Sequence, residues 1–205
     1  MYNTTEMTTI YLIRHGEVEN PEQILYGRLS GYGLSQKGRR EISQTANFLQ
    51  DKNITTLYSS PLERAKESME IIKEKLSLPT VILDENLLEV KTSFQGQPLE
   101  LLRKTNSDFD WFFPPYRQEN DETMEQIRDR MLLFLAEMDK KYPGQTIAVL
   151  SHGDPLMIVK AAIEKRPMNL AAIREGHYLS HGEVLKVTID QGKRSVTTVF
   201  VPEER

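Results

Sequence analysis

The chain contains no cysteine, which excludes disulfide bonds, thiol nucleophiles and zinc–thiolate sites. It also lacks any apolar run long enough to span a membrane, and its first residues have neither the basic region nor the apolar stretch of a signal peptide. The formal net charge of −4 leaves no excess of positive charge for nucleic acid or an anionic membrane. These absences predict a cytoplasmic protein that binds neither nucleic acid nor membranes.

What remains is the composition of an ordinary globular protein. Apolar residues make up 39% of the chain and charged residues 27%, a balance typical of globular domains. A chain of 205 residues can bury a sizeable core, and neither an internal repeat nor a flexible linker divides it. We therefore expect a single domain over residues 1–205.

Short apolar runs alternate with amphipathic stretches along the chain. The apolar runs predict strands at Thr8–Arg14, Thr55–Ser59, Thr80–Leu83 and Thr146–Leu150. The amphipathic stretches predict helices at Gln36–Gln50, after Pro61, from Asp121 or Thr123 to Pro143, and at Asp154–Ile163. A closing hairpin is expected at Glu183–Ile189 and Ser195–Phe200, joined by Asp190–Arg194. This order predicts an α/β fold, a three-layer sandwich whose mainly parallel central sheet is flanked by helices.

Local signals predict where several helices begin and which faces they bury. Ser35 is expected to cap the first helix, and Pro61 to occupy the first position of the second. The Met124–Met138 stretch repeats apolar residues at helical spacing, which predicts a core face rather than a binding surface.

Two long segments have no periodic pattern. Glu17–Leu34 is rich in Gly, Asn, Pro and Ser and predicts a loop, and long ordered loops are usually functional. The segment from about residue 89 to 120 predicts a small cap, formed by an insertion beside the sheet. Its aromatic group, Trp111–Tyr116, either lines a substrate pocket or packs within the cap.

Two similar tripeptides each follow a buried-looking strand. They are Arg14-His15-Gly16 and Ser151-His152-Gly153. Ligands of open α/β sheets bind outside the carboxyl ends of the strands, so two histidines at such ends can share one pocket. Neutral imidazole is a nucleophile and protonated imidazole binds anions, which favours phosphoryl chemistry at this pair.

Phosphoryl transfer needs a nucleophile in line, fixed positive charge on the phosphoryl oxygens and a proton for the leaving oxygen. Arg14 and Arg64 offer guanidinium groups whose planar, forked donors match phosphate. Glu89 is the candidate proton donor, with Asp84 and Glu85 as rivals. This set requires neither a metal nor a cofactor.

Four ordered blocks of the sequence resemble the histidine phosphatase superfamily, which includes the cofactor-dependent phosphoglycerate mutases. The blocks are Leu12-Ile13-Arg14-His15-Gly16-Glu17, Gly27-Arg28 with Leu34-Ser35 and Gly38, Ser60-Pro61-Leu62-Glu63-Arg64-Ala65, and Leu150-Ser151-His152-Gly153. They occur in the family's order and cover most of the chain.

The resemblance implies a role for each matching residue. His15 would be phosphorylated, and Glu89 would act as proton donor. Arg14, Arg64 and His152 would bind the phosphoryl group. Two further residues are candidate substrate contacts. One is Arg28, and the other is Asn20, which stands one place before the position where the family has an asparagine.

The leading prediction is a metal-independent phosphatase that hydrolyses a small phosphomonoester through a phosphohistidine on His15. A phosphoglycerate mutase would use the same residues, but the longer basic and aromatic insert of the mutases is not found in Glu89–Tyr116. A phospho-ligand binding protein without turnover is the non-enzyme alternative. A metallohydrolase is disfavoured because the histidines lack a dense set of carboxylates.

A third tripeptide, Ser180-His181-Gly182, looks like the second. It precedes the predicted hairpin and matches no block of the family. We therefore interpret His181 as structural, and His177 likewise.

Overall fold

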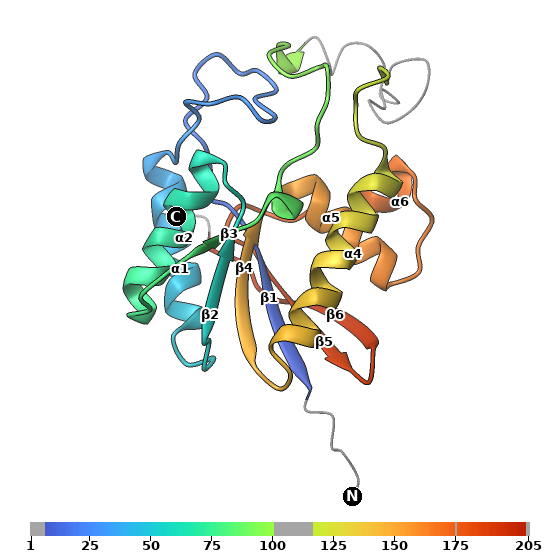
Figure 1. Cartoon of the computed structure of the whole chain (residues 1–205). Coiled ribbons are helices and arrows are strands. Elements are labelled where there is room, and N and C mark those ends of the chain that lie inside the picture. Colours follow the sequence, from blue (N-terminus) through green and yellow to red (C-terminus); the bar gives the residue numbers. More distant parts are fainter. Residues whose placement is uncertain (1–6, 101–116, 175, 204–205) are drawn as a thin grey trace, which may run out of the picture.

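The computed structural model describes residues 7–100, 117–174 and 176–203 (Figure 1). In this part of the chain, six strands form one sheet in the order β3-β2-β4-β1-β5-β6. Their bounds are β1 Thr8–Arg14, β2 Thr56–Ser59, β3 Ile82–Leu83, β4 Thr146–Ser151, β5 Val184–Asp190 and β6 Lys193–Phe200. The first four strands are parallel, whereas β5 pairs antiparallel with both β1 and β6.

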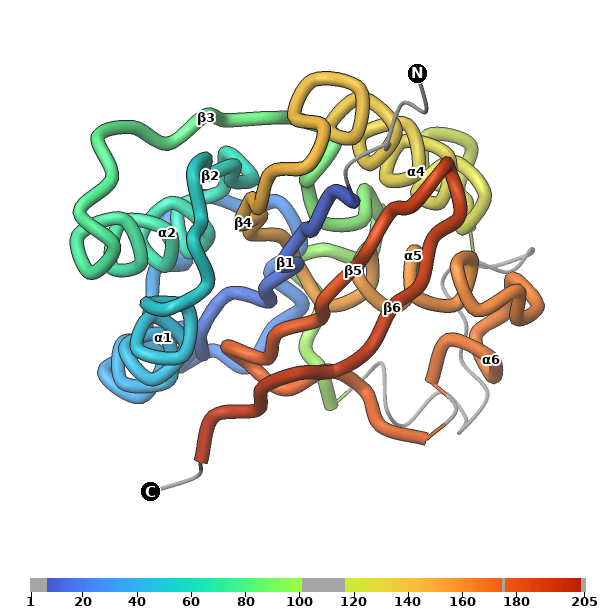
Figure 2. Tube along the Cα trace, turned by 90° about the horizontal axis from the view of Figure 1, so that it is seen from below, coloured from blue at the N-terminus to red at the C-terminus, as the bar shows by residue number. Residues whose placement is uncertain are grey.

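Helices cover both faces of this sheet. They are α1 Gln36–Leu49, α2 Glu63–Leu76, α4 Met124–Lys141, α5 Gly153–Ile163, α6 Leu170–Arg174 and the short 3₁₀ helix η1 Glu85–Leu87. Figure 2 shows α1 and α2 on one side of the strands and α4, α5 and α6 on the other. The predicted α/β fold, with a mainly parallel sheet between helices, is confirmed.

Alternating side chains of the central strands divide the core into two layers. Ile10 and Leu12 of β1 belong to the apolar cluster that α4 and α5 complete. Their neighbours Tyr11 and Ile13 point to the opposite face and join the cluster of α1 and α2. Because strands buried on both faces are apolar at every position, β1 appears in the sequence as a continuous apolar run.

Capping residues begin the helices at defined points. The Ser35 side chain accepts a hydrogen bond from Gly38 N at 3.0 Å, as expected for the cap of α1. Thr123, rather than Asp121, caps α4, and it forms a capping box with Gln126. The apolar stripe of α4 is buried, as predicted.

Several predicted boundaries are wrong. Pro61 does not open α2, because Leu62 is extended and the helix begins at Glu63. The strand expected at Thr80–Leu83 is reduced to β3, Ile82–Leu83. The helices η1 and α6 were not predicted, because they are short and have no clear apolar period.

The hairpin link is also shorter than predicted. Only Gln191 and Gly192 lie between β5 and β6, and both have positive φ, at 47° and 75°. Two-residue turns of this handedness match the right-handed twist of paired strands. The strands therefore extend into most of the predicted Asp190–Arg194 link.

The Glu17–Leu34 segment has neither helix nor strand, as expected of a loop. Isolated bridges join Val18 to Leu34 and Ile24 to Pro98. The second bridge brings the loop against the beginning of the predicted cap. Residues 101–116 of that cap, with the aromatic group Trp111–Tyr116, lie outside the described residues. Within the described ranges, no helix has the length and apolar character needed to cross a membrane.

Gly38 lies where α1 meets the loop after β1. A Cβ at this position would lie 2.1 Å from the backbone oxygen of Glu17. Alanine usually stabilises a helix interior by about 1 kcal/mol relative to glycine. At Gly38 the clash with the Glu17 backbone makes alanine destabilising instead. We expect Gly38→Ala to lower the free energy of unfolding by about 1–3 kcal/mol.

Thermal unfolding measures this effect. Asn47→Ala, at an exposed position of the same helix, is the control and should leave the melting temperature unchanged or raise it. An increased melting temperature for Gly38→Ala would contradict the expectation and show that the backbones at Gly38 and Glu17 can move apart without cost.

Candidate active site

The carboxyl ends of β1, β4 and β2 meet at one edge of the sheet. Register pairs Arg14 with Ser151 and Ser59 with Leu150. The residues that follow these ends are therefore neighbours, and the ring centroids of His15 and His152 lie 5.1 Å apart. The two histidines expected to share one pocket are brought together by parallel pairing alone.

His15 is buried, and both of its ring nitrogens have partners. Nδ1 lies 2.7 Å from the carbonyl oxygen of Gly16, which can only accept, so Nδ1 bears the proton. Nε2 therefore holds a lone pair and accepts from Arg64 Nε at 3.2 Å. Burial, reinforced by the charge of Arg64, holds the pKa of His15 well below its usual value. The ring is a neutral imidazole with Nε2 ready to act as a nucleophile.

His152 is also buried, and it caps the N-terminus of α5. Its Nε2 lies 2.8 Å from Ser60 Oγ, which itself accepts from Leu62 N at 3.4 Å. The Ser60 hydroxyl can therefore donate to Nε2, and we assign the imidazole proton to Nδ1. Burial, with Arg64 nearby, keeps the pKa of His152 well below its usual value. A neutral N–H donor thus stands at the positive end of a helix.

Arg64 is 1% exposed and lies at the beginning of α2. Besides its bond to His15, it donates from Nη2 to the carbonyl oxygen of Gly27 at 2.7 Å. Its guanidinium carbon lies 4.7 Å from the ring centroid of Tyr26. The loop after β1 therefore covers Arg64 and fixes this cation beside His15.

Arg14 is held by the segment that precedes β5. It donates from Nη1 to the carbonyl oxygen of Leu179, and from Nη2 to His181 Nε2 at 3.1 Å. The ring centroid of Tyr178 lies 5.3 Å from its guanidinium carbon. These contacts leave the buried Nε of Arg14 without a partner in the part of the chain that the structure describes.

His181 lies at the site, which sequence reasoning did not anticipate. Its ring centroid is 5.6 Å from that of His15. Burial, with the charge of Arg14 added, lowers the pKa of His181 to about 3, so its Nε2 is a neutral acceptor for Arg14. Gly182 N donates to the Arg14 oxygen at 3.1 Å, and this contact places His181 beside the end of β1. His177, by contrast, bonds to Glu183 at 2.6 Å.

A cavity of about 420 Å³ opens beside these groups. Its lining includes the charged residues Arg14, Arg174, Glu89 and Asp154. Its apolar wall is formed by Ile24, Leu25, Val90 and Leu99, which come from the loop after β1 and from the segment after η1. The cavity is therefore suited to a molecule with an anionic end and a less polar remainder.

Glu89 alone of the three candidate acids lines this cavity. Its Oε1 accepts from Val90 N at 2.8 Å. Burial raises the pKa of Glu89 to about 7, and the nearby carboxylate of Asp154 adds to the effect. Asp84 instead caps η1, and Glu85 is exposed. A carboxyl group that titrates near neutrality can both give and take a proton.

The side chains of the two candidate substrate contacts bind other parts of the protein. The side chain of Asn20 bonds to the backbone of Ile24 in both directions, at 2.9 and 3.2 Å, and so shapes the loop. Arg28 donates to Glu122 and to the backbone oxygen of Glu89, each at 2.7 Å. Neither residue lines the cavity.

Besides His181, sequence reasoning missed three residues that shape the site. Ser60 orients His152, and Tyr178 donates to Asp154 Oδ1 at 2.7 Å. A Cβ at Gly153 would lie 2.4 Å from the Tyr178 hydroxyl, so the glycine makes room for this pair. The Ser-Pro and His-Gly-Asp contexts were the only available signals for Ser60 and Asp154.

Comparisons with known proteins agree with this geometry. The model of the histidine phosphatase superfamily (branch 1) matches residues 10–201. The uncharacterized phosphatase PhoE of Bacillus subtilis is 33% identical over 148 residues, which cover 72% of each chain. Phosphoserine phosphatase 1 of Hydrogenobacter thermophilus is 29% identical over 163 residues, covering 77% of this chain and 76% of that protein.

A solved structure has a similar fold. Bacillus stearothermophilus YhfR superposes with a TM-score of 0.82 at 25% identity, covering 93% of this chain and 96% of that one. The chain belongs to the histidine phosphatase superfamily. The family predicted from the four sequence blocks is thereby confirmed.

The raised pKa of Glu89 has a consequence for stability. A carboxyl whose pKa is higher in the folded state stabilises the fold fully at low pH, and this contribution is lost as pH rises through about 7. Glu89→Gln has no such titration. We expect the free energy of unfolding of Glu89→Gln, relative to that of wild type, to increase by about 1–3 kcal/mol from pH 5 to pH 8.

Unfolding curves at both pH values test this expectation. Glu85→Gln, which changes an exposed carboxyl on the same connection, should keep the pH dependence of wild type. A difference between Glu89→Gln and wild type that is the same at pH 5 and pH 8 would refute the raised pKa.

Proposed function

We propose that this protein hydrolyses a small phosphomonoester through a phosphohistidine on His15. The observation that carries the proposal is a pair of unpartnered donors beside the His15 ring. Among the described residues, three buried side-chain atoms have no hydrogen-bond partner, and two of them are Arg14 Nε and His152 Nδ1. Buried donors without partners are rare, and a phosphoryl oxygen would satisfy both.

In the first step, the lone pair of His15 Nε2 attacks phosphorus, and the bond from phosphorus to the leaving oxygen breaks. Arg64 moves its Nε donor from His15 to a phosphoryl oxygen, so the nucleophile is released as the anion is bound. The protonated carboxyl of Glu89 gives its proton to the leaving oxygen, which departs as an alcohol. Arg14, Arg64 and His152 stabilise the charge on the transferred group.

In the second step, the ionised Glu89 removes a proton from water while the water oxygen attacks phosphorus. The phosphorus–nitrogen bond breaks, phosphate leaves and His15 returns to its neutral form. A pKa near 7 suits Glu89 to both directions of this proton transfer. The neutral ring of His15 is suited to attack over a wide pH range, because its own pKa is strongly lowered.

The names of the relatives support a phosphatase over a mutase. Two of the proteins similar to this chain are named as phosphatases. The cavity beside the site opens between the loop after β1 and the segment after η1, and it is roomy enough to admit water with the substrate. Hydrolysis of the phosphoenzyme is therefore favoured over return of the phosphoryl group to a second oxygen.

Trapping the intermediate tests the nucleophile. Acid-labile, base-stable label should accumulate on His15 when ³²P-labelled phosphomonoester is mixed with wild type and quenched in base. His15→Ala should lose label and at least about a thousandfold of turnover, because no covalent route remains. His177→Gln changes a histidine whose side chain is 57% exposed and bonded to Glu183, and this variant should keep both the label and the turnover. Full turnover by His15→Ala would disprove the mechanism.

Product analysis distinguishes hydrolysis of the substrate from its isomerisation by a mutase. With 3-phosphoglycerate and a bisphosphoglycerate primer, the protein should release free phosphate and form no 2-phosphoglycerate. Formation of the isomer faster than phosphate would identify a mutase. Tight binding of phosphomonoesters with neither product would indicate a phospho-ligand binding protein.

A further inference from the structure

The segment that carries Glu89 has no strand or helix to hold its backbone. The backbone amide of Glu122 donates to the Lys91 oxygen at 2.9 Å, and charged side chains from elsewhere bind the segment and η1. Arg130 donates to the oxygen of Asn86, and Arg28 donates to the oxygen of Glu89 at 2.7 Å. Glu122 accepts from Lys91 N at 2.8 Å. These side chains therefore contribute to the position of Glu89.

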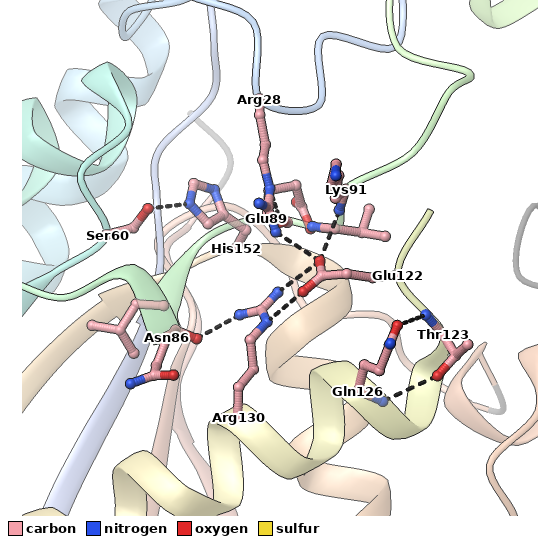
Figure 3. A network of polar contacts seen from close by, with 12 residues as sticks. Arg28, Ser60, Asn86, Glu89, Lys91, Glu122, Thr123, Gln126, Arg130 and His152 are labelled. Carbon is pink, nitrogen blue, oxygen red and sulfur yellow. Dashed lines mark hydrogen bonds and ion pairs between the residues drawn. The ribbon is translucent and has the colours of Figure 1, made fainter. Parts of the chain in front are cut away.

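Glu122 is the centre of this network (Figure 3). Its carboxylate accepts from Arg28 Nη2 at 2.7 Å and from Arg130 Nε at 2.9 Å, in addition to Lys91 N. In Figure 3, Arg28 reaches it from the loop after β1 and Arg130 from α4. One carboxylate thus joins three parts of the chain, and we refer to Arg28, Glu122 and Arg130 as the clasp.

The clasp is shielded from solvent. The side chains of Glu122, Arg28 and Arg130 are 17%, 25% and 14% exposed. Without the carboxylate, two guanidinium groups would face each other with no anion between them, and the amide of Lys91 would lose its acceptor. Removing one member of such a shielded network costs far more than removing an exposed ion pair.

The clasp holds the backbone on both sides of the Glu89 side chain. Arg28 fixes the carbonyl of Glu89 itself, and Glu122 fixes the amide of Lys91 and orients Arg28. Arg130 donates to Glu122 and thereby connects Glu122 and Arg28 to α4, whose apolar face is packed in the core. We propose that Glu122 is a positioning residue for the proton donor Glu89, acting through Arg28 and the Lys91 amide.

This inference rests on the proposed function, in which Glu89 protonates the leaving oxygen. A positioning role therefore has a specific signature. Glycerol 2-phosphate has an alkoxide leaving group that needs the proton, whereas the phenolate of 4-nitrophenyl phosphate leaves readily without it. Glu89 also serves in hydrolysis of the phosphoenzyme, a step common to both substrates, so the comparison uses kcat/KM, which covers only the steps up to release of the leaving group. Misplacing Glu89 should lower kcat/KM only for glycerol 2-phosphate, while a general loss of structure would lower it for both substrates.

We expect Glu122→Ala to lower kcat/KM for glycerol 2-phosphate by about 10–100-fold and kcat/KM for 4-nitrophenyl phosphate by less than about threefold. Glu122→Gln keeps one acceptor oxygen and should lie between Glu122→Ala and wild type. Glu89→Gln should show the same preference for the good leaving group, and adding Glu122→Ala to it should cause little further loss. Glu125→Ala removes an exposed acid of α4 and is the matched control.

Arg28→Ala provides a second route to the same result if Glu122→Ala folds poorly, and circular dichroism verifies the fold of each variant. Equal losses of kcat/KM with the two substrates, or no loss with either, would overturn the positioning role while label on His15 still supports the proposed function. Absence of label on wild-type His15 would instead overturn the proposed function itself.

Discussion

Parallel pairing of β1 with β4, and of β4 with β2, is the constraint on which the rest of the site depends. The pairing sets Arg14 opposite Ser151, and it delivers His15, Ser60 and His152 to one edge of the sheet from positions far apart in the chain. Apolar side chains on both faces of these strands fix the register, because a slip would turn buried residues toward the wrong layer. The stability of the core and the geometry of the site therefore have the same origin.

Burial then determines the protonation states that the chemistry needs. His15 and His152 are kept neutral beside two arginines, since desolvation and the guanidinium charges both disfavour a further cation. The same environment pushes Glu89 in the opposite direction, because burial and Asp154 disfavour its anion more than the arginines favour it. A neutral imidazole, a carboxyl that titrates near neutrality and two guanidinium cations thus lie near one another, as the proposed phosphoryl chemistry requires.

Much of this arrangement could be predicted from the sequence, for a physical reason. Apolar runs followed by polar tripeptides mark the strand ends, and the parallel fold brings those ends together, so His15, His152 and Arg14 could be predicted to meet. Arg28 could not be placed, since its partner Glu122 lies 94 residues away and depends on the path of two loops. His181 was missed because antiparallel pairing of β5 beside β1, rather than any local pattern, brings it to Arg14.

The central claim is that the Nε2 atom of a neutral His15 receives the phosphoryl group. The most direct measurement is ³¹P–¹⁵N correlation NMR on phosphoenzyme trapped in base from protein labelled with ¹⁵N in its histidines. The account predicts phosphorus bonded to Nε2 of His15, because Nδ1 bears the proton that Gly16 accepts. Phosphorus on Nδ1, or on any other residue, would contradict it.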